Sequence, residues 1–320
     1  MTVKTAIIGL GIMGRRMLEN MVLHPGYHPV ALWDPDPEAC RAAQTLAPEA
    51  QICASAAEAI SDADLVYLAC PPAPRKAYSL AAAHMGKAVF LEKPLGVDVG
   101  ASEALVSQIA ECGVPAAVNF TQATGAALTG VKTAAQDGAL GEMIGADIVL
   151  SYSGWPRAWQ KEADWLRYRE EGGMTREVIS HFLFFAERIL GPLAVVWAKP
   201  SFPADPQLCE THMQARLETV DGLPVTVMAS IGGAQPDRQE LTIKGSVASR
   251  RITDFHVDAL SDGGEFVEVA ERPRDPRAAS LKAQLDDLLL CIANKPNRLA
   301  TLEEALRVQE LVETMLSGKD

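Results

Sequence analysis

The sequence predicts an α/β protein in two parts: an N-terminal doubly wound parallel sheet and a C-terminal α+β domain with a mainly antiparallel open sheet. Three observations favour this fold class. A chain of 320 residues exceeds the usual size of one hydrophobic core. Short apolar runs alternate with helical segments up to about residue 120, as in β-α-β units. Strand-like runs with little helix between them dominate afterwards, so we place two domains at 1–120 and 121–320.

The first domain is predicted from its alternation of strands and helices. Its strand candidates are nearly continuous in Val, Ile, Leu and Ala, as parallel strands covered on both faces require. These strand candidates are Val3–Ile8, His28–Trp33, Leu65–Ala69, Ala88–Leu91 and Pro115–Val118. The helices expected between them are Gly14–Leu23, Pro37–Leu46, Arg75–His84 and Gly100–Cys112.

The second domain is predicted from a change of rhythm, because strands now follow one another. The strand candidates are Ile144–Tyr152, Ala194–Lys199, Glu210–Val220, Pro224–Ile231, Glu240–Lys244, Ser249–Phe255 and Glu265–Val269. The expected helices are Gln122–Asp137, Met174–Leu190, Arg277–Ala293 and Thr301–Leu316. A capping box at Thr301 and Glu304 marks the start of the last helix.

The composition excludes some classes of partner. Against 41 acidic residues there are 29 basic ones, and the formal charge of −12 argues against nucleic acid. Six cysteines without a Cys-x-x-Cys pair favour a reducing compartment. Neither a leader segment nor an apolar stretch of membrane-spanning length is recognisable. We expect a cytoplasmic protein with a small-molecule substrate, no nucleic-acid or membrane partner and no metal site.

A glycine motif follows the first strand directly. Gly9, Gly11 and Gly14 form a G-x-G-x-x-G that opens the first helix, with Ile12 and Met13 between the last two glycines. The first glycine permits a tight turn, the second lets a pyrophosphate approach the backbone, and the third allows close helix packing. The helix N-terminus adds unpaired N–H groups for the anion. The motif in this position predicts a Rossmann fold that binds a dinucleotide.

Asp34 ends the second strand, twenty residues after Gly14. A carboxylate there can accept hydrogen bonds from ribose hydroxyls and would repel the additional phosphate of NADP. We therefore expect NAD rather than NADP. The alternative is that Asp34 only caps the helix that starts at Pro35, although the two roles can coexist.

Further motifs resemble those of one protein family. Glu92-Lys93-Pro94, directly after a strand candidate, resembles the E-K-P motif of the Gfo/Idh/MocA oxidoreductases. The resemblance extends over nearly the whole chain. The other similar segments are Cys70-Pro71-Pro72, Asn119-Phe120, Gly172-Gly173-Met174 through His181, Gln284-Leu285-Asp286-Asp287 and Thr301-Leu302-Glu303-Glu304-Ala305.

The resemblance implies a Rossmann domain that binds NAD and an α/β domain whose open sheet forms a homodimer or homotetramer. It implies cofactor contacts from Cys70, Pro71, Pro72, Glu92, Lys93 and Asn119, the last two of which also contact the substrate.

Lys93 has the most specific role that the resemblance implies. It would contact the substrate near the nicotinamide, where a disfavoured ammonium form suits proton exchange with a hydroxyl. A cis peptide bond is implied before Pro94. The alternative is that Lys93 pairs with Glu92 on a solvated edge.

The helix that includes His181 is similar to the family's catalytic helix. The family has an aspartate four residues before this histidine, and Glu177 stands there instead. Four-residue spacing on an α-helix puts both side chains on one face. Histidine is suited to exchanging a hydroxyl proton, so we expect Lys93, His181 and Glu177 to be catalytic. The longer Glu177 leaves an alternative open, in which it pairs with Arg176 or another arginine.

A loop rich in tryptophan and arginine precedes this helix. Aromatic faces suit sugar rings or small aromatic substrates, and arginine binds a carboxylate in a forked geometry. We expect Trp155, Arg157 and Trp165 to contact the substrate. Packing of the loop onto its own domain explains the tryptophans equally well.

These residues together predict an oxidoreductase that transfers hydride between NAD(H) and a hydroxyl or carbonyl carbon of a small sugar, cyclic polyol or related compound. Two alternatives remain: an NAD-binding sensor or regulator without catalysis, and an NAD-dependent enzyme with a non-redox net reaction, such as a glycosidase.

Overall fold

The computed structural model describes residues 2–160, 162–270 and 274–320, which form two compact units. The first unit comprises Met1–Thr124 with Arg277–Leu306, and the second comprises Gly125–Pro276 with Arg307–Asp320. The chain thus returns to the first unit late in the sequence. The predicted single boundary at residue 120 does not include this return.

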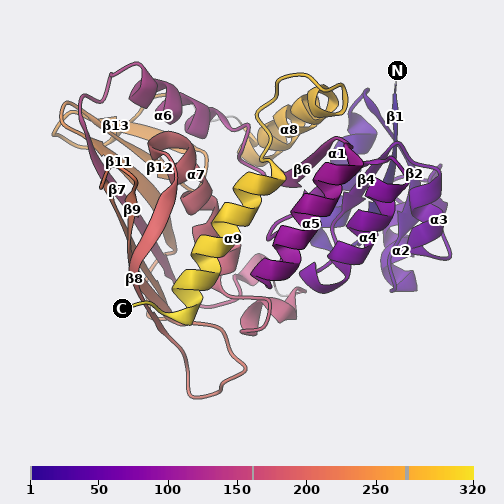
Figure 1. Ribbon diagram of the computed structural model, residues 1–320, viewed down its shortest axis with the longest axis horizontal. Helices are drawn as coiled ribbons and strands as arrows, with labels where there is room; N and C mark the ends of the chain where they lie inside the picture. Colours follow the sequence, from indigo (N-terminus) through magenta and orange to yellow (C-terminus); the bar gives the residue numbers. More distant parts are fainter. Residues whose placement is uncertain (1, 161, 271–273) are drawn as a thin grey trace. The chain divides into compact units, whose positions relative to one another are not determined.

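A six-stranded parallel sheet forms the first unit, in the order β3-β2-β1-β4-β5-β6 (Figure 1). Its strands are β1 (Val3–Ile8), β2 (Tyr27–Trp33), β3 (Gln51–Ile52), β4 (Leu65–Leu68), β5 (Ala88–Glu92) and β6 (Ala116–Asn119). Order and parallel pairing are those of a Rossmann fold, which confirms the prediction. Strand β3 was not predicted, because two residues carry no periodic pattern.

Helices connect these strands, as parallel pairing requires. They are α1 (Ile12–Leu23), α2 (Pro37–Gln44), α3 (Ala56–Ser61), α4 (Pro72–His84) and α5 (Val99–Cys112), and α8 (Pro276–Ile292) joins them from late in the sequence. The short α3 was not predicted.

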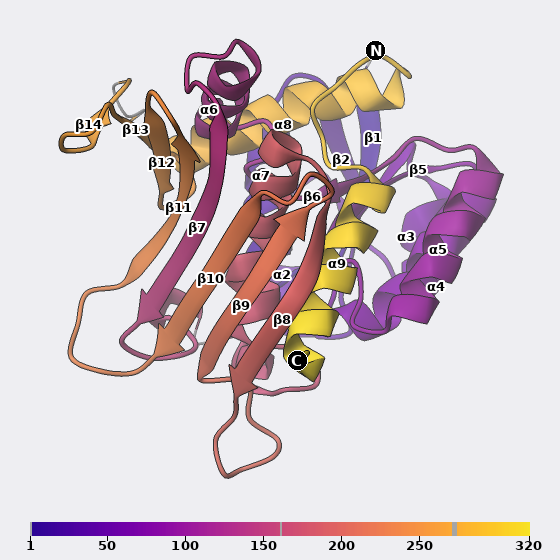
Figure 2. The same cartoon turned by 60° about the vertical axis from the view of Figure 1, so that its left-hand side comes forward.

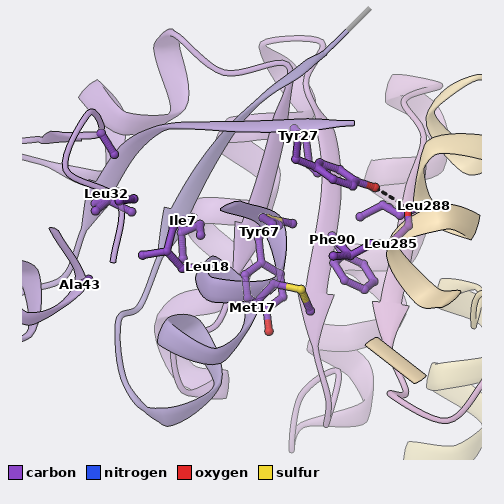
Figure 3. Packing of buried hydrophobic residues seen from close by; sticks show 14 of the residues in the cluster. Ile7, Met17, Leu18, Tyr27, Leu32, Ala43, Tyr67, Phe90, Leu285 and Leu288 are labelled. Carbon is purple, nitrogen blue, oxygen red and sulfur yellow. Dashed lines mark hydrogen bonds between the residues drawn. The ribbon is translucent and has the colours of Figure 1, made fainter. Parts of the chain in front are cut away.

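The core of the first unit explains why α8 belongs to it. Ile7, Tyr67 and Phe90 lie on the neighbouring strands β1, β4 and β5 and are fully buried. They share one apolar cluster with Leu285 of α8 (Figure 3). The Tyr27 hydroxyl on β2 donates to the Leu285 carbonyl oxygen at 2.6 Å, so the helix main chain also satisfies a buried polar group.

An eight-stranded sheet forms the second unit, in the order β14-β13-β12-β11-β7-β10-β9-β8. Its strands are β7 (Met143–Tyr152), β8 (Leu193–Ser201), β9 (His212–Thr219), β10 (Pro224–Ile231), β11 (Arg238–Gly245), β12 (Ser249–Thr253), β13 (Val257–Ser261) and β14 (Val267–Glu268). β7 and β10 pair in parallel and the other neighbours are antiparallel, which confirms a mainly antiparallel sheet. The predicted strand through Phe255 was wrong at its end, because the chain turns at Asp254 and Phe255 and returns as β13.

One face of this sheet packs against helices and the other is open. The helices of the second unit are α6 (Ala126–Gln136), α7 (Ser180–Leu190) and the later part of α9 (Leu302–Ser317). Along β10, Val225, Val227 and Ala229 are buried, whereas Met228 between them is 55% exposed. This alternation is typical of a sheet with one packed face. Figure 2 looks onto the face that no described helix covers.

The start of α9 confirms the predicted capping box. The Thr301 N–H donates to Glu304 Oε2 at 2.9 Å, and the Glu304 N–H donates to Thr301 Oγ1 at 3.2 Å. None of the described helices is both long enough and apolar enough to cross a membrane.

Glu210 receives the start of the segment that leads into α7. Its carboxylate Oε1 accepts the Thr175 N–H at 2.7 Å, and the residue is 1% exposed. A Cβ at Gly173 would lie 2.4 Å from Glu210 Oε2, so the glycine leaves room for this carboxylate. Burial raises the pKa of Glu210 above its usual 4.5, because removal from water disfavours the charged form.

We predict that Glu210→Gln changes the pH dependence of stability. The folded-state pKa lies above the unfolded value, so the wild type loses stability as pH rises from about 4.5 through the raised pKa. The glutamine side chain keeps an oxygen acceptor and cannot ionise. The free energy of unfolding of this variant relative to the wild type should therefore increase with pH, by an amount on the order of 1 kcal/mol. Urea unfolding between pH 4.5 and 8 measures this difference. Glu265→Gln, at an exposed position, is the control, and parallel curves for Glu210→Gln and wild type would contradict the prediction.

Candidate active site

Each of the three glycines in the loop after β1 is explained by a different feature of its surroundings. Gly9 has φ +91°, and a Cβ there would lie 2.5 Å from the Cys70 main-chain nitrogen. A Cβ at Gly14 would lie 1.9 Å from the Gly9 carbonyl oxygen. A Cβ at Gly11 would meet nothing within 4 Å. Protein packing therefore requires Gly9 and Gly14, whereas the space beside Gly11 suits a ligand that approaches the backbone.

The loop lies where a dinucleotide would be held in this fold. β1 and β4 are neighbours at the centre of the sheet, and the strand order reverses between them. The loops that follow them are adjacent, as the contact of Gly9 with Cys70 shows. Helix α1 has Gly11 as its N-cap, without a side-chain hydrogen bond to its first turn. The described residues thus fit a dinucleotide whose pyrophosphate accepts hydrogen bonds from the main-chain N–H groups at the start of α1.

The predicted residues after β4 start the next helix. Pro71 is the N-cap of α4 and Pro72 is its first residue. Cys70 is buried, and burial raises the pKa of its thiol.

Asp34 connects the end of β2 to the glycine loop. Its Oδ2 accepts the Leu10 N–H at 2.7 Å and its Oδ1 accepts the Asp36 N–H at 2.9 Å. The N-cap of α2 is Asp36, whose carboxylate accepts the Glu38 N–H. The alternative that Asp34 caps this helix was therefore wrong. A carboxylate oxygen accepts more than one hydrogen bond, so Asp34 can still receive a ribose hydroxyl.

Glu92 and Asn119 are turned into the first unit. Glu92 Oε1 accepts hydrogen bonds from the Tyr67 hydroxyl and from Asn119 Nδ2, and all three residues are buried. Burial raises the pKa of Glu92, and burial with the neighbouring Glu92 raises that of Tyr67. The alternative of a solvated edge at Glu92 and Lys93 was wrong for Glu92. Cofactor or substrate contacts of Glu92 and Asn119 remain predictions.

Arg75 is a structural residue that the sequence analysis missed. Its guanidinium donates to the main-chain carbonyls of Cys70 at 2.6 Å, of Glu92 at 2.6 Å and of Pro94. It thereby joins the loops after β4 and β5, on either side of Lys93. The Lys93–Pro94 peptide bond is cis, as the resemblance implied. An arginine at the start of a predicted helix carries no sequence signal for such a role.

In the second unit, the helix predicted at Met174–Leu190 begins with a π-helical turn. Thr175–Ile179 is π-helical and α7 follows at Ser180. Glu177 and His181 were predicted to share one face of an α-helix, whereas Glu177 lies in the wider π-helical turn. Such turns occur often at functional sites. Arg176 pairs with both carboxylate oxygens of Glu313 at 2.7 Å and is not available to Glu177.

His181 is buried against an aromatic ring. The centroids of His181 and Phe255 lie 5.0 Å apart, and Phe255 also stacks on Phe182 at 4.8 Å. Phe255 has φ +67°, a conformation unusual for a residue with a side chain. Strained residues of this kind gather at functional sites. Phe255 was not predicted as a site residue, because a positive φ without glycine or asparagine has no sequence signal.

Glu177 pairs with Arg157 and Gln160, as one of the open alternatives foresaw. Glu177 Oε1 accepts a hydrogen bond from Gln160 Nε2 at 2.9 Å and lies 3.6 Å from Arg157 Nη2. The Arg157 Nε–H donates to Gln160 Oε1 at 2.9 Å. The structure therefore brings two predicted residues together through Gln160, which the sequence analysis did not identify.

The tryptophans of the loop differ in their surroundings. Trp155 Nε1 donates to the Leu166 carbonyl at 2.9 Å, so this side chain is fixed by its own unit. Trp159, which was not among the predicted site residues, is exposed, and Trp165 is half-buried in the 3-10 turn Asp164–Arg167. In the described part of the chain, no cluster of three His, Cys, Asp or Glu side chains could hold a metal ion.

We predict that alanine at Gly11 and at Gly14 has separable effects. Gly11→Ala should leave the free protein within about 1 kcal/mol of wild-type stability, because its Cβ enters open space at φ −66°. It should weaken NAD binding at least about tenfold. Gly14→Ala should destabilise the free protein by about 2 kcal/mol or more, because its Cβ collides with the Gly9 carbonyl.

Urea unfolding without NAD and calorimetric titration with NAD measure the two effects. Gly154→Ala is the control, since its Cβ also enters open space but lies outside the glycine loop. Full NAD affinity in Gly11→Ala would rule out the proposed approach of the pyrophosphate.

Comparison with known families agrees with this geometry. The model of the oxidoreductase family Gfo/Idh/MocA, described as an NAD-binding Rossmann fold, matches residues 3–120. The model of the Gfo/Idh/MocA C-terminal domain matches residues 129–250. No curated protein matched the sequence.

Solved structures with the same fold are similar over nearly their whole length. An oxidoreductase from Agrobacterium radiobacter, in complex with NAD+, L-tartaric acid and magnesium, has a TM-score of 0.84 at 18% identity, covering 98% of this chain and 95% of that one. Scyllo-inositol dehydrogenase from Lactobacillus casei, with NAD(H) and scyllo-inositol, has a TM-score of 0.81 at 18% identity, covering 99% of this chain and 96% of that one.

The WlbA dehydrogenase from Bordetella pertussis, in complex with NADH and UDP-GlcNAcA, has a TM-score of 0.82 at 20% identity, covering 99% of this chain and 94% of that one. At these identities, the TM-scores show a shared fold. Together, the two family models span the Rossmann sheet and most of the second unit. The chain therefore belongs to the Gfo/Idh/MocA family and is an NAD-dependent oxidoreductase.

Proposed function

We propose that this protein transfers hydride between NAD(H) and a hydroxyl or carbonyl carbon of a small sugar, cyclic polyol or related compound. The observation that carries the proposal is the open space beside Gly11 at the start of α1, in a chain that matches an oxidoreductase family. The substrate class is supported by similar structures that contain scyllo-inositol, a sugar nucleotide and a hydroxy acid.

The residues proposed for proton transfer are His181 and Lys93. Oxidation of an alcohol removes a proton from oxygen and a hydride from carbon. NAD, when bound, accepts or supplies the hydride. The His181 imidazole takes the hydroxyl proton and returns it in the reverse direction, and Lys93 assists through its charge. Glu177 orients the substrate hydroxyls.

The loops and strand ends position the reactants. Arg75 holds the main chain on both sides of Lys93 through the carbonyls of Glu92 and Pro94, and the buried Glu92 side chain accepts a hydrogen bond from Asn119. A residue on a fixed main chain loses little freedom when it binds a substrate, which lowers the barrier to reaction.

The open face of the second sheet is proposed as the surface of a homodimer or homotetramer. Met228, Val196 and Trp197 are partly exposed on strands of this sheet. Exposed apolar patches on a sheet favour association. The six cysteines are free thiols, which supports a reducing, cytoplasmic compartment.

We predict that Asp34→Ala weakens NAD and reduces discrimination against NADP. The carboxylate accepts ribose hydroxyls and repels the additional phosphate, so its loss should cost about tenfold in NAD affinity. Titration of both cofactors measures the ratio. Asp36→Ala, which removes the α2 cap only, is the control. An unchanged ratio in Asp34→Ala would reject this role.

We predict that His181→Ala and Lys93→Ala each lower kcat by about two orders of magnitude and spare NAD affinity, because they transfer protons. Absorbance of reduced nicotinamide with a panel of polyols and sugars measures turnover. His28→Ala and Lys295→Ala, at exposed positions, are the controls. Retained turnover would reject the assignment. NAD binding without turnover of any substrate would favour a sensor. Turnover without a net redox change would favour an enzyme with a non-redox reaction.

A further inference from the structure

Arg157 is held in place while most of its hydrogen-bonding capacity stays unused. Its Nε–H donates to Gln160, and Nη2 lies 3.6 Å from Glu177 Oε1. That separation is too long for a hydrogen bond, so the contact is charge attraction only. An arginine has five N–H donors. After the bond to Gln160, the four on Nη1 and Nη2 have no hydrogen-bond acceptor among the described residues.

Other buried arginines of this chain are used differently. Arg176 donates to both oxygens of Glu313 at 2.7 Å and to the carbonyls of Arg169 and Gly172. Arg75 donates to three main-chain carbonyls. The guanidinium groups of these two arginines are engaged by acceptors of the protein itself, whereas Nη1 and Nη2 of Arg157 have only the charge contact with Glu177 among the described residues.

Three aromatic rings orient this fork. The guanidinium carbon lies 5.5 Å from the ring centre of Tyr152, 5.7 Å from that of Trp155 and 4.9 Å from that of Trp159. Tyr152 is fixed by a hydrogen bond to Gln239, and Trp155 by its bond to a main-chain carbonyl. The Arg157 side chain is only 13% exposed. Reduced access of water strengthens a charge-assisted hydrogen bond to an incoming anion.

The neighbouring Glu177 narrows the class of anion. A fork of N–H groups matches the two oxygens of a carboxylate or a phosphate. The Glu177 carboxylate, 16% exposed beside Arg157, repels a dianion more strongly than a monoanion. It can also accept a hydrogen bond from a hydroxyl. The pair therefore suits a carboxylate with a hydroxyl on the adjacent carbon.

We propose that Arg157 determines specificity by binding the carboxylate of a polyhydroxy acid substrate, while Glu177 accepts a hydrogen bond from the neighbouring hydroxyl. This inference rests on the proposed function and names its substrate class. The chain's net charge of −12 repels acids at long range, so attraction for an acid has to come from a local cation.

The test compares acids with their uncharged counterparts on the NAD-saturated protein. The pairs are D-gluconate with D-glucitol, D-glucuronate with D-glucose, and L-threonate with L-threitol. Calorimetric titration gives binding and nicotinamide absorbance gives kcat/KM. We expect the wild type to prefer the acid of at least one pair by about 100-fold, because a site built for a charged group rejects an analogue that lacks it. Arg157→Gln should reduce this preference to below about fivefold.

Two further variants separate the fork from general effects. Arg157→Lys keeps the charge and loses the fork, so it should retain an intermediate preference. Arg167→Gln removes an exposed arginine of the same loop, paired with Asp164, and should leave the preference unchanged. Circular dichroism and thermal unfolding establish that each variant is folded.

The outcomes distinguish this inference from the proposed function. Wild-type binding of neutral compounds at least as tight as that of the acids, no binding of any acid, or stronger binding of D-glucose 6-phosphate would overturn the carboxylate assignment. So would an unchanged acid preference in Arg157→Gln. Acid-selective binding lost in Arg157→Gln but without nicotinamide reduction would support Arg157 and reject hydride transfer. Equal turnover of neutral polyols by wild type and Arg157→Gln would support hydride transfer and reject the role of Arg157.

Discussion

The close approach of the glycine loop to the end of β4 is the constraint on which the cofactor site depends. Neither Gly9 nor Gly14 has room for a side chain, because the main chains of the loop, of Cys70 and of α1 are in contact. This contact fixes where α1 begins and keeps its first N–H groups beside the open space at Gly11. Asp34 restrains the same loop through the Leu10 N–H. The backbone geometry proposed to bind a pyrophosphate is thus set by the protein itself, so we expect little ordering of the loop when the ligand binds.

Buried polar groups also restrain the segments that include the residues proposed to act in catalysis. In the first unit, Arg75 and Glu92 join the ends of β4, β5 and β6 through main-chain carbonyls and through Asn119. In the second unit, Glu210 fixes the start of the π-helical turn and Arg176 anchors it to Glu313. A buried polar group left without a partner costs free energy, so such networks hold one arrangement strongly. Lys93 and His181 each belong to a segment that is restrained in this way.

Sequence patterns predicted the fold class, most strands and helices, and the residues of the glycine loop, because alternation and glycine spacing are local properties. They missed β3, α3 and β13, which are too short or too closely joined to a neighbour to show a period. The partners of Glu92 and Glu177 were also beyond reach, since they depend on contacts between residues far apart in sequence. Gln160, Arg75 and Phe255 have no motif. The family resemblance suggested the roles proposed for Lys93 and His181, which neither composition nor spacing would have indicated alone.

The hairpin between β12 and β13 has an uncommon consequence for this chain. Asp254 and Phe255 both have positive φ, and the His256 N–H closes the turn on the Thr253 carbonyl. Short turns between strands usually tolerate insertions and sequence drift. Here the second turn residue carries the ring that covers His181, more than seventy positions earlier in the chain. An insertion or deletion in this hairpin would therefore displace the Phe255 ring from His181. Changes in length that a surface turn usually tolerates would here alter the surroundings of a buried histidine.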